Sequence, residues 1–258
     1  MYRDLTVSVV VPCFNEERQI VRVLGTLPPF VDHVAVVDDG STDRTAEVVR
    51  RFQSGDPRIE LLQHPENRGV GAAIASGYQW ARSHHAGLTV VMAGDAQMDP
   101  EVLPALLDPV AGDLADFCKG NRFKDPASVR AIPRSRVFGN AVLSFLTRLI
   151  SGYGHISDAQ NGYTVLNNRV LETLDWTRMY QGYGQPNDLL VRLSLYHFRV
   201  AEVSHKAIYG CGEASKIKIG RVILPISWLL LRLAFLKMKG SIVGGISAVF
   251  PAKNASQL

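Results

Sequence analysis

The chain has 258 residues, 47% of them hydrophobic and 20% charged, so it can bury a large core, and wholesale disorder is excluded. The formal net charge of +4 fits nucleic acid, anionic lipid or a phosphorylated small molecule, and its sign alone selects none of them. The three cysteines are far apart and lack paired ligand spacing, so neither a disulfide framework nor a zinc site is indicated. No apolar signal-peptide segment precedes the first strand, so we expect a cytoplasmic location.

The first half of the chain alternates apolar, β-branched runs with segments of helical periodicity. The expected strands are 7–11, 34–37, 59–62 and 88–92, and the expected helices are 16–27, 46–52, 69–83 and one that Asp99 caps. Runs that are apolar on both faces are typical of parallel strands buried between helices. We therefore expect an α/β domain whose mostly parallel sheet carries helices on both faces.

The second half of the chain is less regular. In chain order, a basic stretch precedes an expected helix at 137–150, a Gly/Tyr-rich loop at 151–162, a helix at 187–196, a strand at 200–203 and a loop at 212–216. This half therefore adds helices, one further strand and long loops to the sheet of the first half.

Residues 222–236 form a strongly apolar segment that Pro225 and Arg232 interrupt. Its uncharged part is shorter than the roughly 20 residues of a membrane-spanning helix. Flanking cations, and Trp228 among leucines, favour a helix that lies in the interface of an anionic membrane. A helix of the core or of a dimer explains the same pattern equally well. The apolar tail at 241–250 is either a second membrane-dipping segment or a frayed end.

Polar or glycine-rich residues follow each of the first four expected strands. They are Asn15 with Glu16, residues 38–41, residues 67–69, and Asp95 with Gln97. Ligands bind beyond the carboxyl ends of strands in open α/β sheets, so these residues predict one binding site. The acidic turn at 38–41, taken alone, is better explained as an ordinary helix cap.

Asp95 and Gln97 place a carboxylate and an amide at the end of a strand. Mg²⁺ and Mn²⁺ take oxygen ligands and commonly complete their coordination shell with substrate phosphates. One or two protein carboxylates are then enough. We therefore expect Asp95 and Gln97 to hold Mg²⁺ or Mn²⁺ together with a phosphorylated substrate.

Four segments in this order resemble glycosyltransferase family 2, and they are residues 9–17, 36–45, 67–73 and 94–100. Within that family the similarity is greatest to dolichyl- or polyprenyl-phosphate sugar synthases of the dolichol-phosphate mannose synthase type. The resemblance implies a GT-A fold for residues 1–220, with 221–258 as an apolar segment that packs or associates with a membrane. It also implies an inverting mechanism and a nucleotide-diphosphate sugar donor, GDP-mannose or a UDP-hexose.

The resemblance also assigns roles to individual residues. It implies a catalytic set of Asp95, Gln97, Arg136 and Lys216, with Asp95 and Gln97 also facing the metal. It implies a nucleotide pocket of Pro12, Asn15, Glu16, Asp38, Asp39, Gly69 and Gly71. It implies an acceptor site of Arg134, Asn140, Asp158, Gln160, Tyr163 and Ser215. For Arg136 and Asn140, four apart on one expected helix, a solvated basic face is an equal alternative.

Two positions depart from the family pattern. The usual Asp-x-Asp would begin at position 93, where this chain has Ala93, so Asp95 alone supplies the carboxylate. The arginine that often follows the Gly-aromatic pair is Thr164, which puts a phosphate contact at that point in doubt.

The acceptor decides whether a catalytic base is needed. A sugar hydroxyl needs a carboxylate base, for which Asp158 and Asp188 are candidates, whereas a lipid phosphate is already largely dianionic at neutral pH. The basic residues and the cationic tail favour a polyprenyl phosphate as acceptor and a membrane surface, rather than nucleic acid, as partner.

The alternatives are a soluble or cell-envelope glycan acceptor, or a catalytically inert nucleotide-sugar-binding protein. A nicotinamide dehydrogenase is disfavoured because the Gly-x-Gly-x-x-Gly fingerprint is missing.

Overall fold

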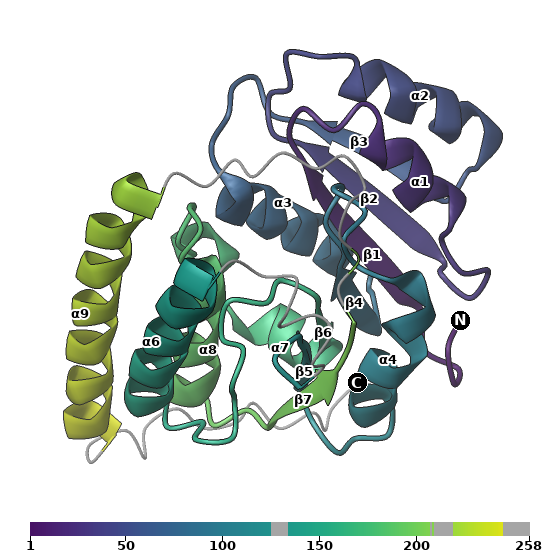
Figure 1. Cartoon of the computed structure of the whole chain (residues 1–258). Coiled ribbons are helices and arrows are strands. Elements are labelled where there is room, and N and C mark those ends of the chain that lie inside the picture. Colours follow the sequence, from purple (N-terminus) through teal and green to yellow (C-terminus); the bar gives the residue numbers. More distant parts are fainter. Residues whose placement is uncertain (125–133, 207, 209–218, 245–258) are drawn as a thin grey trace.

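The computed structural model describes residues 1–124, 134–206, 208 and 219–244 (Figure 1). Within these residues one mixed sheet has the strand order β3-β2-β1-β4-β6-β5-β7. The strands are β1 (Val7–Cys13), β2 (His33–Asp38), β3 (Ile59–Gln63), β4 (Leu88–Val91), β5 (Phe117–Asn121), β6 (Thr164–Asn167) and β7 (Val200–Ser204). Strands β1 to β4 are mutually parallel and β5 pairs in parallel with β7, so the mostly parallel sheet is confirmed.

Strand β6 lies antiparallel between β4 and β5 and joins the two halves of the sheet. The hydrophobic pattern of the sequence predicts neither β5 nor β6. Strand β5 carries Lys119, Gly120 and Asn121 in place of an apolar run, although all five of its residues are buried. Strand β6 has only four residues. Neither strand shows the local hydrophobic pattern that identifies a buried strand in a sequence.

Alternate side chains along the strands face two separate cores, as the period of two in a strand requires. Val10 and Val37 belong to the core beneath helices α3, α7 and α8, whereas Val9 and Val36 belong to the core beneath α1, α2 and α4. Helices therefore cover both faces of the sheet, as expected. Their bounds are α1 (Gln19–Gly25), α2 (Thr45–Gly55), α3 (Val70–Ser83), α4 (Leu103–Ala111), α7 (Asn168–Thr173) and α8 (Gln185–Leu195).

Two short 3₁₀ helices lie at Pro100–Val102 and Trp176–Arg178. The first has the cap that the sequence predicted, because the Asp99 carboxylate accepts a hydrogen bond from Glu101 N at 3.0 Å. Helix α1 begins at Gln19, three residues later than expected. The backbone N–H groups of Asn15 and Glu16 bond instead to Ser41 Oγ in the loop after β2 and to Thr45 Oγ1 at the start of α2.

Helices α6 (Arg134–Ser151) and α9 (Ile219–Gly244) pack with α8 into a helical layer beside the sheet (Figure 1). On α9, the apolar segment foreseen in the sequence turns Leu229 and Leu233 inward against Val191 of α8. Lys237 ties α9 to α6 and α8, because its ammonium donates to the Ser151 carbonyl and to Ser194 Oγ. Among the described residues, no helix is long and apolar enough to cross a membrane. The division at residue 220 stays a prediction.

Candidate active site

The loops after β2 and β4 flank the carboxyl end of β1. Gly94 N donates to Pro12 O at 3.0 Å, and Asp39 N donates to the neighbouring Cys13 O at 2.9 Å. These two bonds place Asp39 and Asp95 at one rim of the sheet, on either side of β1. The rim that sequence analysis expected is therefore present, and Pro12 lies at its centre.

The loop after β1 is fastened to the loop after β2. Asn15, at a backbone φ of 54°, accepts from Thr42 N through its side-chain oxygen at 2.8 Å, and its own N donates to Ser41 Oγ at 2.8 Å. Asparagine is among the residues that tolerate this left-handed conformation. Glu16 N donates to Thr45 Oγ1 at 2.8 Å. Asn15 thus holds two rim loops together, and its contact with a nucleotide stays a prediction.

The acidic turn after β2 is buried and hydrogen-bonded. Asp39 accepts from Arg68 N at 3.0 Å and from Gly69 N at 2.8 Å, and His64 Nδ1 lies 2.7 Å from its carboxylate. Asp38 accepts from Ser41 N at 3.1 Å. Asp39 therefore joins the loop after β2 to the loop after β3 and brings a third strand end to the rim. The contacts of both acids with a base or ribose remain predictions.

The two glycines predicted to admit the nucleotide are approached by the protein's own backbone. A side chain at Gly71 would overlap the carbonyl oxygen of Tyr180, and Gly71 N donates to Gln181 O at 2.7 Å. Gly69, at a φ of 97°, faces the carbonyl of Gln181. These glycines allow the segment before α8 to reach the rim. No local pattern in the sequence predicts this approach.

Asp95 and Gln97 lie side by side after β4, and both are half-buried. The Asp95 carboxylate accepts from Gln97 N at 3.1 Å, across Ala96 at a φ of 59°. Among the described residues there is no cluster of three His, Cys, Asp or Glu that could hold a metal. One carboxylate and one amide oxygen still fit Mg²⁺ or Mn²⁺, provided that substrate phosphates supply further ligands.

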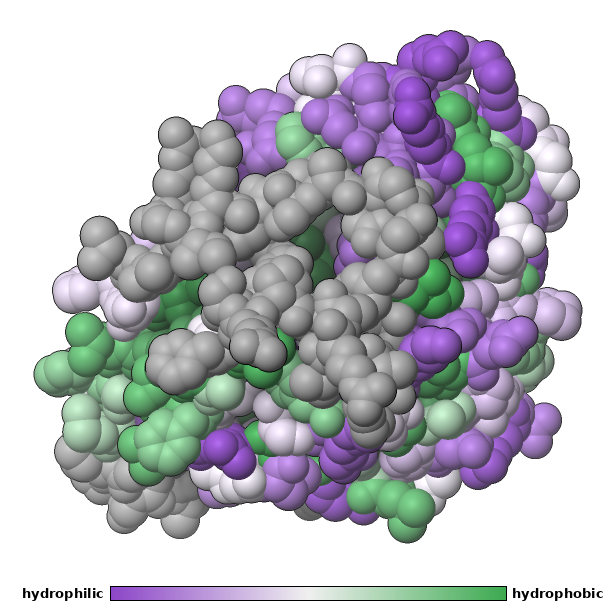
Figure 2. All heavy atoms as spheres, viewed as in Figure 1, coloured by the Kyte–Doolittle hydropathy of each residue, from purple (hydrophilic) through white to green (hydrophobic). Residues whose placement is uncertain are grey.

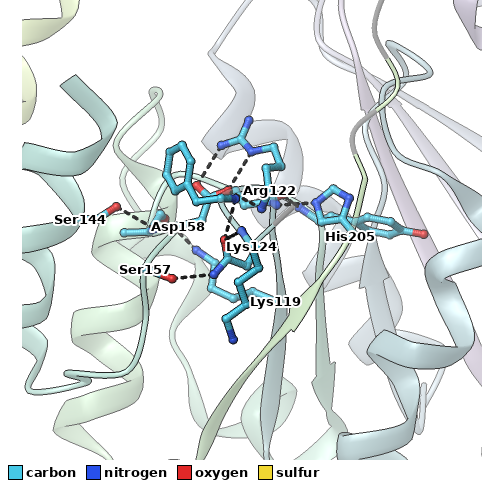
Figure 3. A network of polar contacts seen from close by, with 12 residues as sticks. Lys119, Arg122, Lys124, Ser144, Ser157, Asp158 and His205 are labelled. Atoms are coloured by element: carbon cyan, nitrogen blue, oxygen red, sulfur yellow. Dashed lines mark hydrogen bonds and ion pairs between the residues drawn. The ribbon is translucent and has the colours of Figure 1, made fainter. Parts of the chain in front are cut away.

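A buried network holds the loop that contains Asp158 (Figure 3). Arg122, which follows β5, donates to both oxygens of the Asp158 carboxylate at 2.8 and 2.9 Å. Burial opposes ionisation of Asp158, but the hydrogen bonds and charge of Arg122 outweigh it and hold the pKa of the carboxyl below its usual range. No local pattern in the sequence points to Arg122, because it follows a strand that the hydrophobic pattern does not predict.

Lys119 and Glu202 support the same loop from β5 and β7. The fully buried Lys119 ammonium donates to Ala159 O at 2.8 Å, and burial lowers the pKa of Lys119 to about 8. Glu202 accepts from Asp158 N at 2.9 Å and from Asn121 Nδ2 at 2.6 Å. The loop predicted to receive the acceptor is therefore held on two sides by charged side chains.

The remaining residues of that loop also have internal partners. Tyr163 is buried and its hydroxyl donates to Asp99 O at 2.9 Å, while the Gln160 amide donates to Asn187. Asn161 Nδ2 lies 2.6 Å from His205 Nε2, and a side chain at Gly120 would overlap that imidazole. These bonds join the loop to the segment after β4, to α8 and to the end of β7.

Asp188, the second candidate base, is also buried and paired. Its carboxylate accepts from Arg192 Nε at 2.9 Å and from Tyr180 N at 2.8 Å. Neither Asp158 nor Asp188 is thus exposed to an incoming hydroxyl.

Several predicted site residues cannot be placed as side chains. Ser215 and Lys216 lie outside the described residues. Arg134 and Arg136 belong to α6, where only their backbone is described. Asn140 lies half-buried on α6. The roles assigned to these five residues stay predictions.

The buried lysine predicts a pH dependence of stability. The pKa of Lys119 is about 8 when folded and about 10.4 when unfolded, so the unfolded state binds more protons between these values. The buried charge of Lys119 therefore destabilises the folded protein fully below pH 8, and this destabilisation disappears above the pKa of the unfolded state. The stability of the native protein should therefore rise by about 3 kcal/mol relative to Lys119→Met between pH 7 and pH 11. Urea denaturation of both proteins measures the difference, and a constant difference would contradict it.

The chain is similar to known proteins in sequence and in fold. The family described as Glycosyl transferase family 2 matches residues 8–175. A polyprenol monophosphomannose synthase of Mycolicibacterium smegmatis is 32% identical over 200 residues, which cover 76% of this chain and 74% of the relative. A UDP-N-acetylglucosamine–dolichyl-phosphate N-acetylglucosaminyltransferase of Methanococcus voltae is 26% identical over 219 residues, covering 80% and 87%.

Among solved structures, glucosyl-3-phosphoglycerate synthase from Mycobacterium tuberculosis in complex with phosphoglyceric acid superposes with a TM-score of 0.67. The two are 20% identical, and the match covers 91% of this chain and 80% of that one. This likeness bears on the fold alone, and it confirms the GT-A architecture implied by the sequence. The chain belongs to glycosyl transferase family 2 and is a glycosyltransferase.

Proposed function

We propose that this enzyme transfers a sugar, with inversion, from a nucleotide-diphosphate donor to a polyprenyl or dolichyl phosphate. The observation that carries the acceptor assignment is that Asp158 and Asp188 are both buried and bound to arginines. The Arg122 guanidinium holds the pKa of Asp158 below its usual range, which makes that carboxylate a poor proton acceptor. Asp188 is buried, and its carboxylate already accepts from Arg192 Nε and Tyr180 N. An acceptor phosphate needs no base, since its own oxygen is already anionic at neutral pH.

The names of the relatives support the same acceptor. Those from Mycolicibacterium smegmatis and Methanococcus voltae are named for polyprenol and dolichyl-phosphate substrates. A third relative, from Micrococcus luteus, is 27% identical over 243 residues and is named undecaprenyl-phosphate mannosyltransferase. These names differ in the sugar transferred, so they leave the donor of this enzyme open between GDP-mannose and a UDP-hexose.

In this proposal Asp95 and Gln97 hold Mg²⁺ or Mn²⁺ against the donor diphosphate. A solved structure of the M. tuberculosis synthase contains Mn²⁺ and UDP, which is in keeping with the use of a divalent metal in this fold. The bound cation would neutralise negative charge on the leaving diphosphate. The rim loops orient the donor, and the acceptor phosphate would be placed by α6 and the loop around Asp158, at the cytoplasmic surface of a membrane.

The direct test is transfer of labelled sugar by the purified protein from a panel of nucleotide sugars, with Mg²⁺ or Mn²⁺. We expect the label to enter a polyprenyl-phosphate extract. Transfer only to water-soluble glycans would refute the lipid acceptor, and donor binding without any transfer would identify an inert nucleotide-sugar-binding protein. Soluble glycan and phosphoglycerate acceptors in the same panel separate these outcomes.

Restoring the missing acid should strengthen metal binding. In the family pattern that the sequence resembles, Asp-x-Asp would begin at Ala93, which lies on the same loop as Asp95. We expect Ala93→Asp to lower the Mn²⁺ concentration for half-maximal transfer about tenfold, since a second carboxylate joins an oxygen-ligated cation. Ala93→Asn is the matched control that adds a side chain without charge. An unchanged Mn²⁺ requirement would place the metal away from this loop.

A further inference from the structure

Helix α6 has its apolar and polar faces reversed relative to an ordinary surface helix. Its buried residues include Ser144, Thr147 and Ser151, whereas Phe145 and Leu149 are 57% and 73% exposed. The exposed stripe recurs at helical spacing and consists of Val142, Phe145, Leu146 and Leu149. A surface helix normally turns such a stripe toward the core. The outer face of α6 is therefore suited to an apolar environment.

Hydrogen bonds to the buried hydroxyls fix this orientation. Ser144 Oγ accepts from Ala159 N at 3.0 Å. Thr147 Oγ1 donates to Leu143 O at 2.7 Å and accepts from the Asn187 amide. The bond to Leu143 lies within α6, but turning α6 about its axis would break the other two bonds and leave Ala159 N and the Asn187 amide without these partners, which is costly in a protein interior. The apolar stripe is therefore held outward by the rest of the fold.

Helix α9 lies beside α6 and presents a second apolar stripe. Its inner face packs on α6 and α8, while Trp228 and Phe235 are 72% and 64% exposed, with Leu231 between them. Figure 2 shows hydrophobic residues gathered on the side of the molecule where α6 and α9 lie in Figure 1. Because α6 and α9 pack against each other, the two stripes are brought to neighbouring helices, and exposed apolar side chains gathered in this way mark an interaction surface.

The charges on both helices have one sign. Helices α6 and α9 contain no Asp or Glu, although the chain has 24 acids. Their cations are Arg134, Arg136, Arg148, Arg221, Arg232, Lys237 and Lys239. The Arg148 guanidinium lies 6.0 Å from the ring of Phe145, at the apolar stripe itself. Apolar side chains interleaved with cations match a bilayer that carries anionic head groups.

We propose that the outer faces of α6 and α9 together dock on an anionic lipid bilayer. Phe145, Leu149, Trp228 and Phe235 enter the interfacial region, and Arg148 and Arg232 meet the phosphates of the head groups. The inner face of α6 bonds to the loop around Asp158, so one helix connects the bilayer to the site. The inference extends the proposed function, in that a lipid acceptor would reach the site along α6.

Trp228 provides a direct reporter of docking. All three tryptophans lie within the described residues, and Trp80 and Trp176 are buried while Trp228 is exposed. We expect brominated phosphatidylcholine mixed with phosphatidylglycerol, in vesicles without prenyl phosphate, to quench the emission of the full chain. Trp228→Phe should abolish the quenchable component. If the vesicles do not quench the tryptophan emission, the proposal is overturned.

Paired variants separate the apolar and the charged contributions. Phe145→Ser combined with Phe235→Ser should weaken binding to vesicles, measured by co-sedimentation, at least about tenfold. The reason is that two aromatic side chains no longer enter the bilayer. The control is Val21→Ser with Leu114→Ser, two exposed apolar residues on other elements, which should bind like the native protein. Arg148→Gln with Arg232→Gln should weaken binding to anionic vesicles about 25-fold, at about fivefold for each cation.

Two measurements distinguish membrane docking from self-association and from a loss of catalysis. Light scattering without lipid tests self-association, and a dimer that Phe145→Ser dissociates would show that the face joins two copies of the chain. A short-chain, water-soluble prenyl phosphate tests the enzyme apart from docking. The docking variants should keep native transfer to that acceptor and lose transfer to a long-chain acceptor in vesicles. Vesicle binding without transfer to either acceptor would refute the proposed function while leaving the docking surface intact.

Discussion

Replacing Asp95 by Asn is expected to reduce the rate of sugar transfer by about 10²–10³-fold, the loss that follows removal of one group stabilising a transition-state charge. The Asp95 carboxylate accepts a hydrogen bond from Gln97 N on the rim, and Ala93 offers no acid two residues before it. Asparagine can still accept from Gln97 N, so the loop should keep its shape. Steady-state transfer at several Mn²⁺ concentrations measures both the rate and the metal requirement.

The control for Asp95→Asn is Asp99→Asn, four residues further on. The Asp99 side chain caps a 3₁₀ turn, and asparagine caps a helix as well as aspartate does. We expect Asp99→Asn to keep native stability and transfer. If Asp95→Asn retained a rate within about threefold of the native enzyme, well short of the effect of losing such a group, the metal and the diphosphate would have to be bound elsewhere.

Replacing Asp158 by Asn is expected to lower the free energy of unfolding by about 3 kcal/mol at pH 7. The substitution removes the charge that compensates Arg122 and the buried Lys119, and breaking a buried pair by removing one partner is strongly destabilising. The pKa of Asp158 is lowered in the fold, so its stabilisation is present above the unfolded pKa and is lost as pH falls through the folded pKa. Native protein and variant should therefore converge at acid pH.

Urea denaturation of single and double variants tests whether charge pairing gives Asp158 its effect on stability. Arg122→Gln combined with Asp158→Asn should recover part of the lost stability, because neither charge is then left without its partner. Glu47→Gln, which breaks an exposed pair with Arg51, is the matched control and should change little. A double variant whose loss equals the sum of the single losses would show that the two side chains act independently.

The sheet of the first half was predictable because its signals are local. Runs of valine that end in Pro12 or Asp38 carry both the hydrophobic pattern of a buried strand and the polar residues that follow it. The convergence of the loops at one rim then follows from parallel pairing, since carboxyl ends of parallel strands meet at the same edge. Bonds from Gly94 and Asp39 to the end of β1 confirm that arrangement.

The parts that sequence analysis missed depend on contacts between distant segments. Strand β5 is buried although it carries Lys119, because Ala159 O and the carboxylates of Asp158 and Glu202 surround that ammonium. Gly71 is required by the carbonyl of Tyr180, more than a hundred residues away in the chain. No window of sequence contains both partners of such a contact, so no local pattern can report it.

By itself, the sequence determined the class of fold, the family and the four strand ends that form the rim, because each depends on residues adjacent in the chain. Tertiary structure alone decided that the two candidate bases are bound to arginines and that α6 turns its apolar stripe outward. The spacing of Val142, Phe145, Leu146 and Leu149 describes a stripe but not its direction. That direction is set by Ser144 and Thr147, which are buried and accept hydrogen bonds from Ala159 N and from the Asn187 amide, both outside α6.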